Sequence, residues 1–185
     1  MKKIFLQLLL ISLLVAEPGF AGYAEGMASY KKDDYASALR EFKPLAEQGD
    51  SHAQATLGFM YANGHGVPQD YQQALIWFRK AALQGEAYAQ NSLGIAYANG
   101  QGVAMSRVVA YALYNLSAAQ APSYNTGAAY KRATLANEMT AKEIEAAQNL
   151  TREMAKPGNL LKALDRYDNK WWRFYDYIRS FFNRP

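Results

Sequence analysis

Residues 49–84, GDSHAQATLGFMYANGHGVPQDYQQALIWFRKAALQ, and residues 85–120, GEAYAQNSLGIAYANGQGVAMSRVVAYALYNLSAAQ, are two copies of one 36-residue unit. At an offset of 36 residues, Leu57-Gly58 of the first copy aligns with Leu93-Gly94 of the second. A fixed period of this length is typical of a stacked repeat array. We therefore predict an all-α fold, a right-handed α-α superhelix in which helical hairpins stack on one another and C-terminal helices close the stack.

The first half of the unit has the spacing of a helix. Ala53, Leu57 and Tyr61 recur at intervals of four residues, which places them on one helical face. Gly58 has no side chain, so a second helix can approach closely there. The helix is expected to end at Asn63-Gly64, because glycine readily takes the positive φ that ends helices.

The second half of the unit has the residues expected at the start of a helix. Asp70 can accept hydrogen bonds from free backbone amides, and Gln73 three residues later completes a capping-box pattern. In the second copy Ser106 holds the equivalent place and can still cap. An apolar stripe around Phe78 follows, and it is too wide to be covered within one hairpin. Each hairpin therefore needs a neighbour to bury it.

The spaced pattern AQxxLGxxYxxGxGVxxDYxxAxxWxxxAAxQG resembles the Sel-one-like repeat (SLR), a relative of the tetratricopeptide repeat. The resemblance covers residues 49–120. The second copy departs from the pattern after Val103, because Ser106-Arg107 replaces Asp-Tyr and Leu113 stands where the first copy has Trp77. The resemblance implies a role in signalling, envelope assembly or host contact.

Residues 1–21 have the features of a signal peptide. A basic Lys2-Lys3 precedes an apolar run, and Gly19-Phe20-Ala21 supplies the small residues of a cleavage site. We expect cleavage after Ala21 or after Ala24; an uncleaved membrane anchor is the alternative, for which the run is short. The sequence has no cysteine, so neither a lipoprotein anchor nor a disulfide framework is available. We predict a periplasmic or secreted protein.

Two further segments extend the array at either end. Residues 22–48 have the pattern of a shortened, tetratricopeptide-like first repeat, in which Asp33-Asp34 caps the second helix. Residues 121–155 leave the repeat pattern, and we expect helices over 127–139 and from the capping box at 140–143 onward. This pair is predicted to cap the exposed apolar end of the stack.

The C-terminal segment, residues 156–185, differs in composition and holds seven basic and three acidic residues. As one helix it would present an aromatic stripe, and that stripe either folds onto the stack or docks on a membrane surface or partner. Asp168 lies in the stripe and argues against deep insertion in a membrane. The candidate docking residues are Trp171, Trp172, Arg173, Tyr175, Arg179 and Phe182.

Little in the sequence resembles a catalytic site. The two histidines, His52 and His65, lack metal-ligand spacing, and the Gly-x-Gly pairs lack the rest of a phosphate-binding loop. Ser29 and Lys32 match a Ser-x-x-Lys motif but are better explained as a solvated helix end. We predict a non-enzymatic protein with no cofactor, no metal and no nucleic-acid partner.

Binding is therefore the predicted function, on the concave side that first helices line in such solenoids. The tetratricopeptide pattern, carried over with Gly26, Gly58 and Gly94 as anchors, implies which residues face that side. They are Tyr23, Met27, Tyr30, Lys31, His52, Ala55, Phe59, Asn63, Tyr88, Asn91, Ile95 and Asn99. The alternative for Phe59 and Ile95 is that they only pack between neighbouring first helices.

The leading hypothesis is an exported scaffold or adaptor that binds a protein or peptide partner in the bacterial envelope. Two alternatives stay open at this point. One is an envelope enzyme of a β-lactamase-like or cell-wall-acting type. The other is a membrane-surface structural protein docked through residues 159–185.

Overall fold

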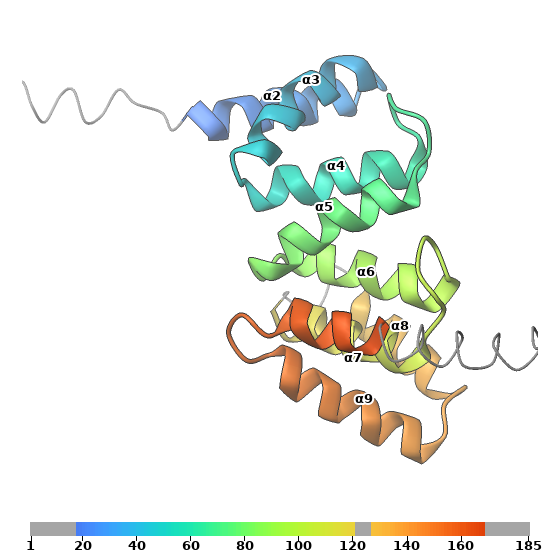
Figure 1. Ribbon diagram of the computed structural model, residues 1–185. Coiled ribbons are helices and arrows are strands. Elements are labelled where there is room, and N and C mark those ends of the chain that lie inside the picture. Colours follow the sequence, from blue (N-terminus) through green and yellow to red (C-terminus); the bar gives the residue numbers. More distant parts are fainter. Residues whose placement is uncertain (1–17, 121–126, 169–185) are drawn as a thin grey trace, which may run out of the picture.

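The computed structural model describes residues 18–120 and 127–168, with side chains from residue 22 onward (Figure 1). All regular structure in these ranges is helical. The labelled helices are α2 (Pro18–Tyr30), α3 (Tyr35–Glu47), α4 (Ser51–Asn63), α5 (Tyr71–Leu83), α6 (Ala87–Asn99), α7 (Arg107–Gln120), α8 (Ala128–Ala136) and α9 (Ala141–Met154). Residues 160–168 are also helical. The predicted all-α fold is confirmed.

The helices form a stack of antiparallel hairpins. α2 packs on α3, α4 on α5 and α6 on α7, and the second helix of each hairpin contacts the first helix of the next (Figure 1). The predicted hairpin stack is therefore the architecture of the described chain.

One glycine in each hairpin lets its two helices touch. A Cβ built on Gly58 would lie 2.7 Å from the Phe78 ring, and one on Gly94 would lie 2.6 Å from the Tyr114 ring. Gly26 has the same relation to Phe42, at 2.6 Å. Any side chain would displace the facing ring, because interiors are close-packed. The close approach predicted at Gly58 is confirmed there and at its equivalent Gly94, and Gly26 shows the same contact without having been predicted to.

The helix ends are held largely as predicted. Gly64 and Gly100 adopt the left-handed conformation, with φ of 72° and 69°. The Asp70 carboxylate accepts from the backbone N–H of both Gln72 and Gln73. The second hydrogen bond of the expected capping box, from the Asp70 N–H to the Gln73 side chain, was wrong. The Asp70 N–H donates to the Tyr61 carbonyl instead, at 2.9 Å.

The second copy keeps its second helix in spite of its departure from the pattern. Ser106 Oγ accepts from the Val109 N–H at 3.3 Å, so this serine caps α7. Leu113, which replaces Trp77 of the first copy, is completely buried. The apolar spacing, and not the identity of single residues, is what maintains α7.

The loop of each hairpin packs on the preceding hairpin. A Cβ on Gly66 would lie 2.9 Å from the Tyr35 carbonyl oxygen, and one on Gly102 would lie 3.0 Å from the Tyr71 Cβ. Tyr35 and Tyr71 are equivalent residues, 36 positions apart, and each begins the second helix of its hairpin. These loop contacts set the distance from one hairpin to the next.

The C-terminal helices cover the end of the stack. α8 and α9 both contact α7, and α9 begins with the predicted capping box between Thr140 and Glu143. Leu150, Met154 and the fully buried Leu164 join the same apolar core as α5, α6 and α7. The predicted cap is therefore present, and its last described helix, 160–168, folds onto the stack.

Candidate functional site

Two adjoining cavities lie along the first helices of the hairpins. The first, about 420 Å³, is bounded by α4, α5 and α6, and the second, about 260 Å³, by α2, α4 and α6. Phe59 of α4 and Tyr88 of α6 line both cavities, so the two are neighbours separated by a shared aromatic wall. We call the pair the groove.

Most of the residues predicted to face the concave side meet in the groove. Phe59, Asn63, Tyr88, Asn91 and Ile95 line the first cavity. The second cavity is lined by three predicted residues from α2 together with the two shared ones; those from α2 are Tyr23, Met27 and Tyr30. The alternative for Phe59 and Ile95 is only partly right, because both pack against the core and also border open space.

Four of the predicted residues do not line either cavity. Lys31 and Asn99 are exposed at the ends of their helices, and Ala55 is buried in the core. His52 is 68% exposed, with Nδ1 3.8 Å from Glu86 Oε1. These residues lie at helix ends or turn inward. A pattern carried over from a related repeat does not distinguish such positions from those that face the groove.

The shared wall between the two cavities is made of aromatic rings. The Phe59 ring centroid lies 6.4 Å from that of Tyr30 and 6.1 Å from that of Tyr88. Such edge-on and tilted pairs are favourable arrangements of aromatic rings. The wall is therefore a firm, apolar surface contributed by three successive hairpins.

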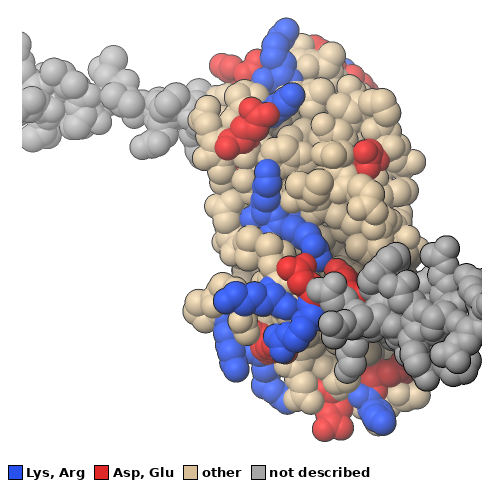
Figure 2. Space-filling model, viewed as in Figure 1, with Lys and Arg blue, Asp and Glu red and all other residues tan. Residues whose placement is uncertain are grey.

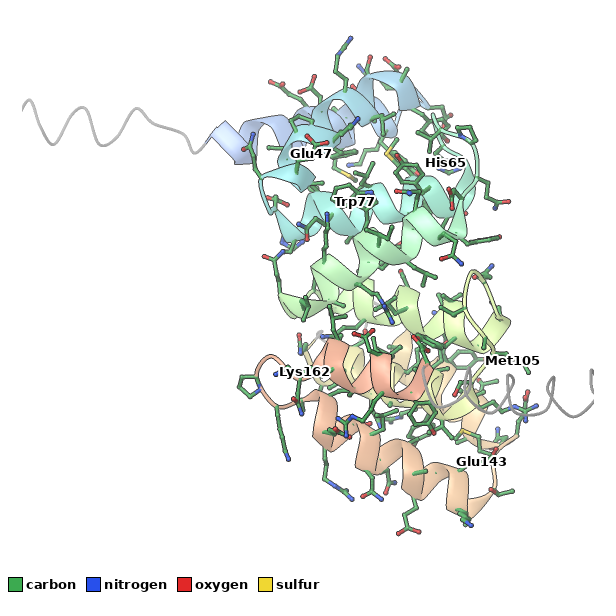
Figure 3. All side chains as sticks on the ribbon, in the orientation of Figure 1. Glu47, His65, Trp77, Met105, Glu143 and Lys162 are labelled. Carbon is green, nitrogen blue, oxygen red and sulfur yellow. The ribbon has the colours of Figure 1, made fainter. Side chains whose placement is uncertain are left out.

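Residues that the sequence analysis missed support this wall from the side. His65, in the loop after α4, stacks on Tyr35 at 4.4 Å, and its Nδ1 lies 2.5 Å from the Tyr30 hydroxyl. In the next loop the equivalent residue Gln101 donates to the Tyr71 hydroxyl at 3.4 Å and lines the first cavity. Figure 3 shows the two loops along one edge of the stack, where His65 and Met105 are labelled. The recurrence of Tyr35 and Tyr71 at 36 residues was the signal that could have identified these contacts.

Carboxamides are the main polar groups of the first cavity. Asn63 and Gln69 donate to the Phe59 and Ala62 carbonyls, both at 2.8 Å. Asn91 is only 4% exposed, and its Oδ1 has no hydrogen-bond partner among the described residues. An acceptor in this state is uncommon in a folded protein. The Asn91 side chain therefore brings to the groove an acceptor, Oδ1, that has no hydrogen-bond donor among the described residues.

Charge is nearly absent from the groove. Lys131, from α8, is the single Lys, Arg, Asp or Glu among the described residues that line the two cavities. Burial raises the pKa of Tyr88 to about 12, so its phenol is neutral at physiological pH. The groove thus offers apolar surface and neutral hydrogen-bonding groups.

Charged groups lie instead over the first hairpin and around the C-terminal helices, as the face in Figure 2 shows. The Arg79 guanidinium of α5 lies 2.8 Å from Asp168 and 3.2 Å from Asp165, and the Tyr97 hydroxyl donates to Asp168 at 2.9 Å. We call these four residues the latch, since they join the helix 160–168 to α5 and α6. The aromatic docking residues predicted beyond it, Trp171 to Phe182, lie outside the described residues.

Other predicted features are located as follows. Ser29 and Lys32 lie at the end of α2, where the Lys32 N–H donates to the Ser29 carbonyl. Within residues 18–120 and 127–168 no three His, Asp or Glu side chains are grouped so that they could hold a metal ion. In the same ranges, no helix has both the length and the apolar character needed to cross a membrane.

Comparison with known proteins agrees with the repeat pattern. The family model described as Sel1 repeat matches residues 51–86 and 87–122, two consecutive units of 36 residues. A search of curated proteins found no match. The predicted repeat resemblance is confirmed for these two units.

Several solved structures resemble the chain, and two of them are SLR proteins. One is a protective antigen present in uropathogenic Escherichia coli strains that displays an SLR fold, with a TM-score of 0.70 and 29% identity over 81% of this chain. The other is a Sel1 repeat protein from Oxalobacter formigenes, with a TM-score of 0.57 and 32% identity over 63% of this chain. The chain spans 32% and 46% of the lengths of these two proteins. The fold is thus that of SLR proteins, and the chain contains two Sel1 repeats within it.

Proposed function

We propose that this chain, which contains two Sel1 repeats, is an exported, non-enzymatic adaptor that binds a protein or peptide partner in the bacterial envelope through its groove. The observation that carries the proposal is the groove itself, an aromatic and carboxamide surface that runs from α2 to α6. Concave surfaces of helical solenoids are suited to extended partners. Aromatic and methionine side chains are enriched where proteins meet.

Export is supported by residues 1–21, with their basic start, apolar run and small residues before position 22. Of the two expected cleavage sites, the structure favours the one after Ala21. The Tyr23 hydroxyl lies 3.2 Å from Thr56 Oγ1, and its ring packs 5.4 Å from that of Phe42. Cleavage after Ala24 would remove these contacts, so the mature chain is proposed to begin at Gly22.

A non-enzymatic role is supported by the placement of the histidines. Neither lines the groove: His65 is held between Tyr35 and Tyr30, and His52 lies beside Glu86 on the surface. The groove-lining residues themselves are apolar, aromatic and carboxamide side chains with two aliphatic hydroxyls, those of Thr56 and Ser92, and one lysine. That composition favours recognition over acid–base chemistry, which needs a positioned titratable group.

Site-specific photocrosslinking in the bacterium tests the proposal. A photoreactive phenylalanine at position 59, inside the groove, should give a discrete light-dependent adduct in the envelope fraction. The same residue at position 76, where Ile76 is 47% exposed on α5 outside the groove, is the matched control and should give none. Equal adducts from both positions would contradict binding in the groove. Recovery of the chain in the cytoplasm, with residues 1–21 intact, would contradict export.

A further inference from the structure

Asn91 carries a polar group at a place where the preceding repeat has an apolar residue. The residue at the equivalent place in the preceding repeat, 36 positions earlier, is Ala55, and it is as well buried as Asn91, at 3% against 4% exposed. The hairpin framework is therefore complete without an amide at this place. A buried acceptor that lacks a donor is costly, so the amide in the second repeat serves something other than the hairpin.

The missing donor can reach Asn91 from the first cavity, which its side chain lines. A half-turn about χ2 exchanges the oxygen and nitrogen of a carboxamide without changing its volume. Apolar groups such as Phe59, Tyr88 and Ile95 border the cavity beside the carboxamides of Asn63, Gln69 and Gln101, so the ligand is expected to combine apolar bulk with hydrogen-bonding groups that include an N–H donor. Each residue of a peptide except proline carries such a donor in its backbone.

The shared aromatic wall defines the spacing of the ligand. Because Phe59 and Tyr88 border both cavities, two side chains that fill them must lie next to each other on one side of the ligand. In an extended chain the nearest residues on one side are two positions apart, roughly 6.6–6.8 Å. The first cavity, about 420 Å³, is larger than the second, about 260 Å³, so the larger of the two apolar side chains is assigned to the first.

The charges of the groove restrict the ligand further. No carboxylate is among the described residues that line the cavities, and Lys131 borders the larger one. A lysine or arginine inserted there would be buried without an opposite charge, which is strongly unfavourable.

We infer that the groove takes an extended peptide segment with apolar side chains at two alternate positions, neither of them basic, and with one backbone N–H donated to Oδ1 of Asn91. This inference rests on the proposed function and names the chemistry of its partner. The larger anchor is held between Phe59 and Ile95, and the smaller one lies against Tyr23 and Met27.

Selection of a random twelve-residue peptide library on the mature chain tests the inference. The enriched sequences should share two apolar residues separated by one residue. Synthetic peptides with Phe and Leu at separations of one, two, three and four positions then give dissociation constants by fluorescence anisotropy. The separation of two should bind at least tenfold more tightly than the others, and lysine at either anchor should abolish binding.

The contribution of Asn91 is measured from both sides of the contact. Asn91→Leu should weaken binding about tenfold, whereas Asn99→Leu, an exposed asparagine on the same helix, should change it less than twofold. N-methylation of one peptide amide should weaken binding of the wild-type chain by the same factor, and should have no further effect on Asn91→Leu. If Asn91→Leu does not fold, the N-methyl scan on the wild-type chain tests the contact alone: one sensitive peptide amide supports it.

The outcomes separate this inference from the proposed function. An enriched motif without alternate apolar residues, or equal sensitivity to all N-methyl groups, overturns the inference and leaves groove binding intact. If the library yields no enriched peptide but position 59 still crosslinks, the partner is a folded surface. That result also overturns the inference and leaves groove binding intact. Loss of the crosslink at position 59 when cell-wall glycan fragments are added before illumination also overturns the inference. Failure of both the selection and the crosslink overturns both proposals.

Discussion

The two 36-residue repeats are alike where hairpins are joined and differ at several of the positions that border the groove. Gln54 and Gln90, which are equivalent, both donate from Nε2 to the end of the preceding hairpin, to the carbonyls of Ala46 and Ala82. The close helix contacts at Gly58 and Gly94 are also common to both repeats. Sequence identity between the copies therefore marks the framework.

The groove positions of the same two repeats carry different chemistry. Phe59 in one repeat corresponds to Ile95 in the other, and buried Ala55 corresponds to buried Asn91. One framework thus presents a different surface from each hairpin. The comparison teaches that the positions which change within a fixed framework are the ones to test for recognition, and the positions which recur are the ones to test for stability.

The largest effect is expected at the recurring glycines. Gly58→Val and Gly94→Val each place a side chain where a Cβ alone would lie 2.7 or 2.6 Å from an aromatic ring. Overpacking of this kind costs roughly 3 kcal/mol of unfolding free energy. Urea denaturation followed by circular dichroism measures it, with Ala119→Val on the exposed side of α7 as control. A loss in one repeat and not in the other would break the equivalence of the two copies.

The next effect comes from exchanging the residues that differ between the repeats. Ala55→Asn introduces an unpaired amide into the core of the first repeat and should cost about 1–3 kcal/mol. Asn91→Leu removes an unpaired acceptor and should leave the free energy of unfolding unchanged or raise it. The same urea titration measures both. A large loss of stability in Asn91→Leu would show that the amide belongs to the framework after all.

A third, smaller effect distinguishes Phe78 from Tyr114, the equivalent rings that cover the two glycines. Burial raises the pKa of Tyr114 to about 12, against 10 in the unfolded chain. The folded state therefore holds this proton more tightly, and the resulting stabilisation is complete below pH 10 and is lost as the pH rises from 10 to 12. At pH 11 the loss is about 1.4 kcal/mol. Tyr114→Phe should remove this part of the alkaline decline in urea titrations between pH 8 and 11.

Phe78 shows that a ring without a hydroxyl fits this place in a hairpin, so Tyr114→Phe is not expected to lose stability at pH 8. Tyr130→Phe is the matched control, because that side chain is 77% exposed and already surrounded by water. An alkaline decline that is the same in Tyr114→Phe as in the wild-type chain would contradict the effect of burial.

The features that the sequence predicted correctly are those with local causes. The repeat period, the glycine contacts and the caps at Asp70 and Thr140 depend on residues a few positions apart or on spacing that recurs. Most of the groove could be predicted for the same reason, since one helical position per turn faces it. The capping box at Asp70 failed because the chain folds back and offers the Tyr61 carbonyl to the same N–H.

The features that the sequence did not predict join distant segments. Asp168 looked like an obstacle to membrane insertion, yet it contacts Arg79 and Tyr97, which lie 89 and 71 residues earlier. Lys131 reaches the first cavity from α8, a helix outside the repeat pattern. No local pattern encodes such contacts, because they arise from how the C-terminal helices settle on the finished stack.

The smallest effect concerns the outer side of the same two repeats, where equivalent residues hold the C-terminal helices. Arg79 binds the helix 160–168, and Asn115, 36 positions later, donates to Thr151 of α9 and accepts from Arg132 of α8. Arg79→Met should cost about 1 kcal/mol, since the latch is partly exposed to water. Arg40→Met, whose ion pair is on the open surface, should cost close to nothing.

The pH dependence of that loss identifies its cause. Burial raises the pKa of Asp168, and Arg79 opposes the rise, so the pKa should climb further in Arg79→Met. A carboxyl with a raised pKa favours the folded state most when it is protonated, below its ordinary pKa, and that advantage is lost as the pH rises. The stability difference between Arg79→Met and the wild-type chain should therefore shrink from pH 7 to pH 4 in urea titrations. A difference that stays constant over this range would mean that Arg79 stabilises the helix 160–168 by packing its aliphatic stem, and the latch would then be apolar in origin.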